Sequence, residues 1–296
     1  MTAITAEQKP DLREPKGWRR TKNRTMTALM VLSFILVIIP LGFVLFTVVA
    51  KGASVISWSF LTSSIPPVTA PVGVGGIGPA IVGTIEIVSL ATVFAVPLGV
   101  LGAIYLNEYG GSNWLSKFIG FMADVMTGVP SIVMGLFIFS IWVLHFGFSG
   151  LAGALALGAL MLPIVIRSTY EMLLLVPNSL REGSYALGAS KSRVTLTVVL
   201  PAAAGGIVSG VLLAVARAAG ETAPLLFTIL TVTEANPNVF SGPNTSLPSL
   251  IFANATQPYP AAQERGWGAA LTLIAIAFIL MIAARVVTAR YARYQR

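Results

Sequence analysis

The sequence predicts an all-α integral membrane protein with six transmembrane helices. Its mean hydropathy is +0.83 and only 10% of its residues are charged, whereas soluble domains usually contain about a quarter charged residues. Several apolar runs reach the length of about 20 residues that spans roughly 30 Å of hydrocarbon as a helix. The net charge of +8 is concentrated at the two ends of the chain. These observations exclude a soluble multidomain protein.

The apolar runs and the breaks between them divide the chain in order. Residues 1–26 are expected to form a basic, disordered tail, and the first span at 27–50 is too long for the apolar region of a cleaved signal peptide. Residues 51–77, rich in Ser, Pro and Gly, form a loop, 78–288 form the core, and 289–296 form a basic C-terminus. The expected spans are 27–50, 78–106, 117–145, 149–170, 202–230 and 267–288.

The positions of the basic residues predict the orientation. Seven Lys and Arg residues lie in 9–24, and four Arg residues lie in 285–296. Because Lys and Arg accumulate on the cytoplasmic side of membrane proteins, both termini are expected in the cytoplasm. The loops 51–77 and 231–266 then lie outside. Topology and contact with membrane lipids explain the basic ends, so no nucleic-acid partner is expected.

Several kinds of chemistry have no candidate residues. The chain has no cysteine and a single histidine, His145, so we expect no metal site and no cofactor on this chain. It also lacks a G-x-S-x-G sequence, which disfavours an intramembrane hydrolase. The triplets at Asn244 and Asn254 match a glycosylation pattern that is common by chance, and we assign no glycan to them.

A short charged stretch, REGSYALGASKSRVTLTVVLP at residues 181–201, separates the fourth and fifth spans. It predicts a short cytoplasmic helix at about 181–192, with small apolar residues on one side. Pro201 suits re-entry into the membrane, since proline is tolerated in the first turn of a helix. Composition alone also allows an ordinary amphipathic loop on the lipid headgroups.

The spacing within this stretch resembles the EAA motif of importer-type ABC permeases. Glu182 is followed by two small residues, then by Gly188, and after nine intervening residues by Val198-Val199-Leu200-Pro201. Gly183-Ser184 replaces the usual Ala-Ala pair. The resemblance implies a coupling helix that docks on an ATP-hydrolysing subunit. The residues implied in coupling are Glu182, Gly183, Ser184, Ala186, Leu187, Gly188 and Ala189.

Longer stretches resemble PstA-type permease subunits of phosphate-specific ABC importers. They are GGIGPAIVGT (75–84), GVPSIVMGLFIF (128–139), LPIVIRSTYEMLLLVPNSLREGSYALGAS (162–190) and ARAAGETAPLLFT (216–228). The resemblance implies a MetI-like ABC permease fold in a bacterial or archaeal plasma membrane. It also implies four further subunits: a second homologous permease, two ATPases and an extracytoplasmic phosphate-binding protein. Because the chain has no G-x-x-x-x-G-K-[ST] loop, ATP and Mg are expected on the partner ATPase and no enzymatic activity on this chain.

The fifth span carries a candidate anion path. Arg217 lies 16 residues after Pro201, which is roughly 24 Å along a helix and well inside the hydrocarbon. An intramembrane arginine usually faces a cavity or a partner, and its planar fork suits phosphate oxygens. Glu221 is expected on the same helical face, and Pro224 frees the carbonyl of Gly220. The expected pathway or gating residues are Arg217, Gly220, Glu221, Thr222 and Pro224.

Two interpretations of Arg217 and Glu221 remain open at this point. The pair either holds spans together as a static ion pair, or acts as a switch in which Arg217 leaves Glu221 for the passing anion. In PstA-type permeases this Arg and Glu belong to the transport path, which favours the switch.

Other polar residues in the spans have expected structural roles. Glu86 and Asp124 are expected near span ends, at the membrane interface or between subunits. Arg167 and Glu171, four residues apart, are expected to pair at the cytoplasmic end of the fourth span. A last group is expected to serve helix packing rather than a kink: Thr127, Gly128, Pro130 and Ser131.

The predicted function is therefore the membrane permease subunit of an ATP-driven importer for inorganic phosphate. The nearest alternative keeps the architecture and carries another oxyanion, such as sulfate or molybdate. A secondary transporter or channel that works without ATP is a further alternative, but it leaves the spacing from Glu182 to Pro201 unexplained.

Overall fold

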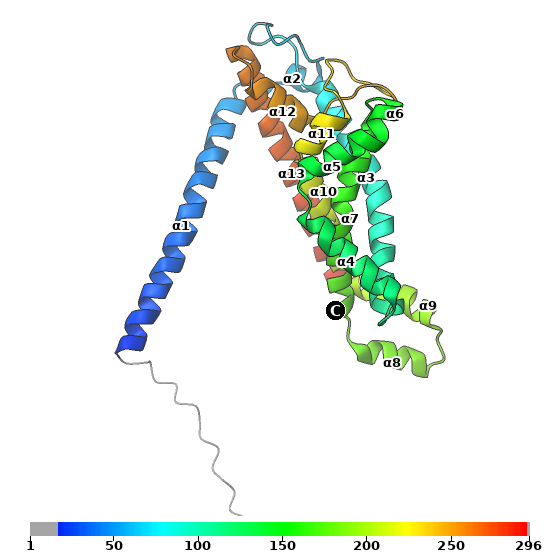
Figure 1. Ribbon diagram of the computed structural model, residues 1–296. Helices are drawn as coiled ribbons and strands as arrows, with labels where there is room; N and C mark the ends of the chain where they lie inside the picture. The colour runs from blue at the N-terminus through cyan, green and yellow to red at the C-terminus, as the bar shows by residue number, and fades with distance from the viewer. Residues whose placement is uncertain (1–16, 295–296) are drawn as a thin grey trace, which may run out of the picture. The chain divides into compact units, whose positions relative to one another are not determined.

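The computed structural model describes residues 17–294, and all regular elements in that range are helices (Figure 1). Residues 1–16 of the expected basic tail and residues 295–296 of the C-terminus lie outside the described residues. The chain divides into two compact units, Met1–Val49 and Ala50–Arg296.

The first unit contains most of helix α1 (Trp18–Gly52), which begins well before the span expected at 27–50. The basic residues Arg19, Arg20, Lys22 and Arg24 therefore lie in the first turns of a helix, and not in a disordered tail. The most apolar part of α1 has a mean hydropathy of 2.9. Its large apolar side chains are exposed on all sides, as expected of a helix surrounded by lipid.

The second unit contains the remaining helices. The long helices that cross it are α3 (Gly78–Ile104), α7 (Gly150–Leu174), α10 (Leu200–Ala219) and α13 (Pro260–Tyr294). Shorter helices are α2 (Trp58–Thr62), α4 (Trp114–Gly128), α5 (Ser131–Ile138), α6 (Leu144–Phe146), α8 (Asn178–Ala186), α9 (Lys191–Val194), α11 (Ala223–Thr228) and α12 (Leu247–Ala255). Three π-helical turns interrupt them, namely η1 (Tyr105–Tyr109), η2 (Phe139–Val143) and η3 (Thr195–Val199).

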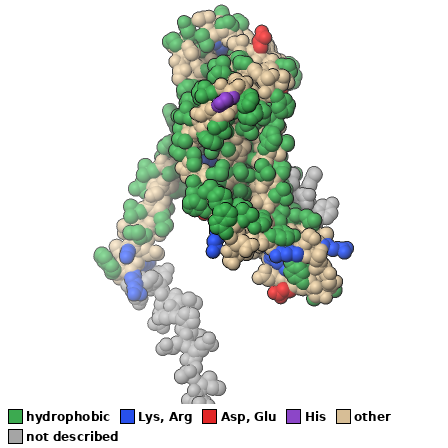
Figure 2. All heavy atoms as spheres, turned by 45° about the vertical axis from the view of Figure 1, so that its right-hand side comes forward, with side chains coloured by type: hydrophobic (Ala, Val, Ile, Leu, Met, Phe, Trp, Pro, Cys, Tyr) green, Lys and Arg blue, Asp and Glu red, His purple; other side chains and the backbone are tan. Residues whose placement is uncertain are grey.

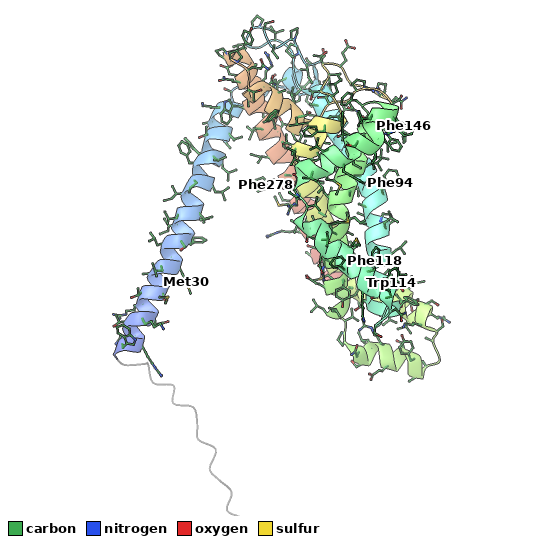
Figure 3. All side chains as sticks on the ribbon, viewed as in Figure 1. Met30, Phe94, Trp114, Phe118, Phe146 and Phe278 are labelled. Carbon is green, nitrogen blue, oxygen red and sulfur yellow. The ribbon has the colours of Figure 1, made fainter. Side chains whose placement is uncertain are left out.

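Within the described residues, five helices are long and apolar enough to span a membrane, and α4 with α5 makes a sixth span if the bent pair is counted as one. This agrees with the predicted all-helical membrane class. Figure 2 shows hydrophobic side chains covering the side of the second unit, with Lys and Arg gathered at the end that carries α8 and α9. On α4, Trp114 and Phe118 lie side by side (Figure 3), with ring centroids 5.4 Å apart.

The third expected span, 117–145, is not a straight helix. It breaks between α4 and α5, and the two parts are bent by 107°. Val129 is extended, with ψ 124°, because the following proline disfavours helical backbone at this residue. A Cβ added to Gly128 meets nothing within 4 Å, so the expected packing role is not found there. The residues around Pro130 make a bend instead.

Helix α7 is the centre of the second unit and contacts α3, α4, α5, α10 and α11. Its first half is a run of Gly, Ala and Leu, and most of these small residues are buried. Ser149 caps the helix by accepting a hydrogen bond from the Ala152 N–H at 3.1 Å. Small residues let membrane helices approach closely, where apolar burial alone provides no driving force between them.

The close contact between α3 and α7 predicts how substitutions of glycine on α3 affect stability. A Cβ added to Gly99 of α3 lies 2.7 Å from Cγ1 of Val165, whereas one added to Gly102 lies 3.6 Å from its nearest neighbour in Ile166. Gly99→Ala is expected to destabilise the purified protein by about 1–3 kcal/mol through overpacking. Gly102→Ala is the matched control, expected to be neutral or stabilising because alanine favours helix. Thermal unfolding in detergent measures both, and equal melting temperatures would contradict the proposed close packing.

The end of the second unit opposite α8 is held by polar contacts. Arg265 of α13 is buried and donates hydrogen bonds at 3.2–3.3 Å to the carbonyls of Pro67, Val68 and Ala70. In the same region the N–H of Leu247 donates to Thr84 Oγ1 at 2.8 Å, which ties α12 to α3. The expected loops 51–77 and 231–266 therefore contain ordered helices, α2 and α12, and are fastened to the spans.

Candidate functional site

The fifth expected span, 202–230, is broken beside Arg217. Helix α10 ends at Ala219, and the N–H groups of Gly220 and Glu221 make tight 3.1 Å bonds to the carbonyls of Arg217 and Ala218. Helix α11 begins at Ala223, with proline in its first turn. Pro224 has no N–H to donate to the Gly220 carbonyl, so the helix cannot continue through this point.

Arg217 and Glu221 lie together at this break. Nε of Arg217 is 3.7 Å from Oε1 of Glu221, too long for a hydrogen bond. Glu221 lies beyond the end of α10, so the two do not share a regular helical face as expected. The Arg217 side chain is 70% exposed in this chain and that of Glu221 is 23% exposed. The guanidinium is therefore loosely held and open to a ligand or to a partner.

The other side of the break is tightly packed. A Cβ added to Gly135 of α5 would lie 2.6 Å from Cα of Pro224, so only glycine allows this approach. Pro224, Leu225 and Thr228 are buried, and the Thr228 hydroxyl donates to the Pro224 carbonyl at 2.9 Å. Of the expected pathway residues, Pro224 thus anchors the break and Gly220 and Thr222 form it. Beside it, Arg217 is exposed and Glu221 is half-buried.

Two of the other polar residues form an ion pair that the spacing did not indicate. Arg167 of α7 pairs with Asp124 of α4, and not with Glu171 as expected. Asp124 therefore joins two helices within the chain. Glu86 of α3 has one carboxylate oxygen that is buried and has no hydrogen-bond partner. Within residues 17–294 no group of three His, Asp or Glu side chains gathers to hold a metal ion.

The expected coupling residues lie on α8 and the turn that follows it. The helix covers Asn178–Ala186, so it begins and ends earlier than the expected 181–192. Gly188 has a φ of +81° and ends the helix in the left-handed conformation that favours glycine. Its role within the chain is thus to terminate α8, which the resemblance did not imply.

The outer side of this segment is open. Glu182, Gly183, Ala186, Leu187 and Gly188 are exposed, and Leu187 is 90% exposed. A Cβ added to Gly183 meets nothing within 4 Å. Ser184 and Ala189 are half-buried. The segment offers a surface of small and apolar residues that no other part of the described chain covers.

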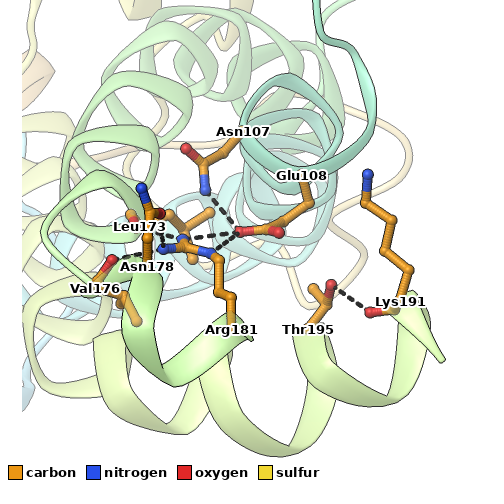
Figure 4. Close-up of polar contacts among 8 residues, drawn as sticks. All are labelled: Asn107, Glu108, Leu173, Val176, Asn178, Arg181, Lys191 and Thr195. Carbon is orange, nitrogen blue, oxygen red and sulfur yellow. Dashed lines mark hydrogen bonds and ion pairs between the residues drawn. The ribbon is translucent and has the colours of Figure 1, made fainter. Parts of the chain in front are cut away.

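The inner side of α8 is fastened through Arg181, and sequence reasoning missed its partner (Figure 4). Nε and Nη2 of Arg181 donate to Oε1 of Glu108, in η1, at 3.3 and 3.0 Å. The Arg181 side chain is 14% exposed and that of Glu108 is 4% exposed. The only available signal was an acidic residue directly after the long apolar run at 78–106.

The fold and site define a membrane permease chain, with a break in the fifth expected span beside Arg217 and a short, largely exposed helix, α8, between two spans. The sequence profile of the family described as "Binding-protein-dependent transport system inner membrane component" matches residues 95–293. The chain belongs to this family. The matched range includes α8, the break after α10 and Arg217.

Curated relatives match over nearly the whole chain. The "Phosphate transport system permease protein PstA 1" of Mycobacterium tuberculosis (strain ATCC 25618 / H37Rv) is 44% identical, over 91% of this chain and 88% of the relative. The "Phosphate transport system permease protein PstA" of Yersinia pestis is 41% identical over 94% of both chains. The protein of the same name from Haemophilus influenzae is 43% identical, over 86% of this chain and 89% of the relative.

Solved structures share the fold at low sequence identity. A chain of a bacterial alginate ABC transporter in complex with its periplasmic protein aligns with a TM-score of 0.64, at 13% identity, over 92% of this chain and 97% of that one. A chain of the inward-facing MetNI methionine ABC transporter aligns with a TM-score of 0.57, at 16% identity, over 73% of this chain and 94% of that one. These alignments agree with the expected MetI-like permease fold.

Proposed function

We propose that this chain is a permease subunit of an ATP-driven importer of inorganic phosphate. The observation that carries the proposal is its 44% identity, over 91% of its length, to a phosphate transport system permease. The exposed guanidinium of Arg217 beside the break in the fifth span supports it independently, since such a cation in a membrane helix marks an ion pathway.

The proposed assembly contains a second homologous permease, two ATPases that hold ATP and Mg, and an extracytoplasmic phosphate-binding protein. The chain supplies half of the pathway and hydrolyses nothing itself. The α8 end, where Lys and Arg gather (Figure 2), faces the cytoplasm together with both termini, as the distribution of basic residues favours. The loops around α2 and α12 then face the binding protein.

The proposed mechanism uses Arg217 and Glu221 as a switch. Arg217 is held by Glu221 at 3.7 Å, without a hydrogen bond, so it can turn toward an arriving anion at little cost. Its planar fork then donates to two phosphate oxygens. Glu221 regains the guanidinium when the two permease halves rock, and this favours release of the anion.

The anion itself is tested by competition. Phosphate at neutral pH keeps a proton that it can donate to the Glu221 carboxylate, whereas sulfate has no proton to donate and is repelled. Expression with its partner subunits is expected to restore phosphate uptake in cells that lack a phosphate importer. A hundredfold excess of sulfate or molybdate is expected to leave that uptake unchanged. Uptake of sulfate or molybdate without phosphate uptake would instead establish the alternative oxyanion permease.

A further inference from the structure

The docking segment, residues 178–191, contains α8 and the turn that follows it. Its side chains contact two neighbouring residues of η1. Arg181 of α8 binds Glu108, and Lys191 at the start of α9 lies 5.1 Å over the ring of Tyr109. Both residues of η1 sit where α3 ends. The docking segment is therefore attached on either side of its central turn to the end of one transmembrane helix.

Of the two contacts, the one made by Arg181 is the stronger. Besides Glu108, its guanidinium donates to the carbonyls of Val176 and Leu173 at 2.5 and 2.9 Å, and to Asn178 Oδ1 at 3.3 Å. The Asn107 amide donates to the same Glu108 oxygen at 2.7 Å. Leu173 and Val176 lie at the end of α7, where free carbonyls favour a cation. One guanidinium thus joins α8 to the ends of both α3 and α7 (Figure 4).

Burial makes this contact rigid. Glu108 is buried and Arg181 is largely buried, and opening such an ion pair is strongly disfavoured, because either charge alone would be left without compensation. The Lys191–Tyr109 contact is made by two exposed side chains and is weak by comparison. Movement of α8 relative to η1 therefore has to strain the Arg181–Glu108 pair first.

Neighbouring side chains on α8 point to opposite sides of the helix. Arg181 points inward to η1 and α7, while the next residue, Glu182, is exposed on the docking surface. Gly110, directly after η1, packs closely against α4, because a Cβ added to it would lie 2.5 Å from Ser116 Oγ. Helix α5 follows after the bend and packs Gly135 against Pro224, beside Arg217.

We infer that Arg181 and Glu108 form a latch through which movement of the docking helix α8 is passed to α3 and α7. Arg181 is a positioning residue for coupling, and it touches neither the anion nor ATP. The inference rests on the proposed function, since it requires that a partner ATPase pushes on α8. Without the latch, the ATPase still docks on the exposed side of α8, but the movement of α8 is no longer transmitted to α3 and α7.

The test uses the complete importer in proteoliposomes, with three readouts: co-purification of the ATPase, ATP hydrolysis, and phosphate taken up per ATP hydrolysed. Glu108→Gln keeps the shape and removes the charge. It is expected to retain the ATPase and its hydrolysis while phosphate uptake per ATP falls at least tenfold. Lys117→Met is the control, since it removes an exposed positive charge from α4. It is expected to leave the ratio unchanged.

A double variant separates coupling from folding. Arg181→Met alone leaves the buried Glu108 carboxylate without its positive partner and is expected to lower the melting temperature. Adding Glu108→Gln removes the uncompensated charge and is expected to restore the melting temperature. If the pair is a latch, uptake per ATP stays at least tenfold low in the double variant.

Recovery of uptake per ATP together with the melting temperature would show a purely structural role and overturn the inference. An unchanged ratio in Glu108→Gln would do the same. These outcomes differ from a failure of the proposed function. In that case the wild-type chain itself would co-purify with no ATPase or transport no phosphate.

Discussion

Arg217→Ala is expected to lower phosphate uptake by the assembled importer about 100-fold while leaving the complex intact. A guanidinium that donates two charge-assisted hydrogen bonds contributes roughly 1.5–3 kcal/mol for each, which amounts to a factor of about 100 or more when both are lost. The residue is 70% exposed and makes no hydrogen bond to Glu221, so its removal should not disturb folding. Uptake of labelled phosphate in proteoliposomes measures the effect, and size-exclusion chromatography checks the assembly.

Two further variants decide between a switch and a static ion pair. Arg217→Lys keeps the charge without the planar fork, so it is expected to retain an intermediate rate. Glu221→Gln leaves Arg217 unopposed, so a switch predicts tighter binding with slower release, seen as a lower KM and a lower maximal rate. A static pair predicts instead that every variant loses stability and assembly together. Normal phosphate uptake by Arg217→Ala would refute both roles.

Gly183→Trp is expected to abolish association with the ATPase. A Cβ added at this exposed position meets nothing within 4 Å in the chain itself, so the variant should fold, and the large ring would instead block the close approach of a partner to α8. The loss is expected to be complete in co-purification, with phosphate uptake falling to background. This substitution is cleaner than one at Gly188, where a φ of +81° adds backbone strain for any other residue.

Gly183→Ala is the matched control. Alanine is small and raises helix propensity by about 1 kcal/mol relative to glycine. It is therefore expected to retain both the ATPase and transport. If the tryptophan variant also retains them, then α8 does not dock the ATPase. A secondary transporter or channel predicts that no ATPase co-purifies with the wild-type chain.

The sequence predicted those features that depend on local pattern. Apolar run lengths predicted the membrane class and the positions of the long helices, because a bilayer demands helices of a fixed minimum length. The spacing from Glu182 to Pro201 predicted a short helix between two spans, and α8 occupies that place. Pro224 predicted the broken backbone beside Arg217, because the loss of an N–H is a property of one residue.

Features that depend on contacts between distant elements were not predictable in this way. Pro130 was visible in the sequence and breaks the helix, but the contacts that α5 then makes with α7 and α11 involve elements distant in the sequence. Arg167 was assigned to the acidic residue four positions away, while its partner lies on another helix. Spacing along one helix does not encode which face meets a neighbour, so the pairing of Glu108 with Arg181 also escaped notice.

The π-helical turn η1 adjusts the angular phase of the chain where α3 ends. The Gly110 N–H donates to the Tyr105 carbonyl, five residues earlier, at 2.6 Å. This turn therefore contains one residue more than a regular α-helical turn. Each residue advances a helix by about 100°. Without the extra residue, α3 could not both face α7 along its length and aim Glu108 at Arg181. An insertion or deletion within this short turn is therefore expected to turn Glu108 away from Arg181, because it rotates every side chain that follows.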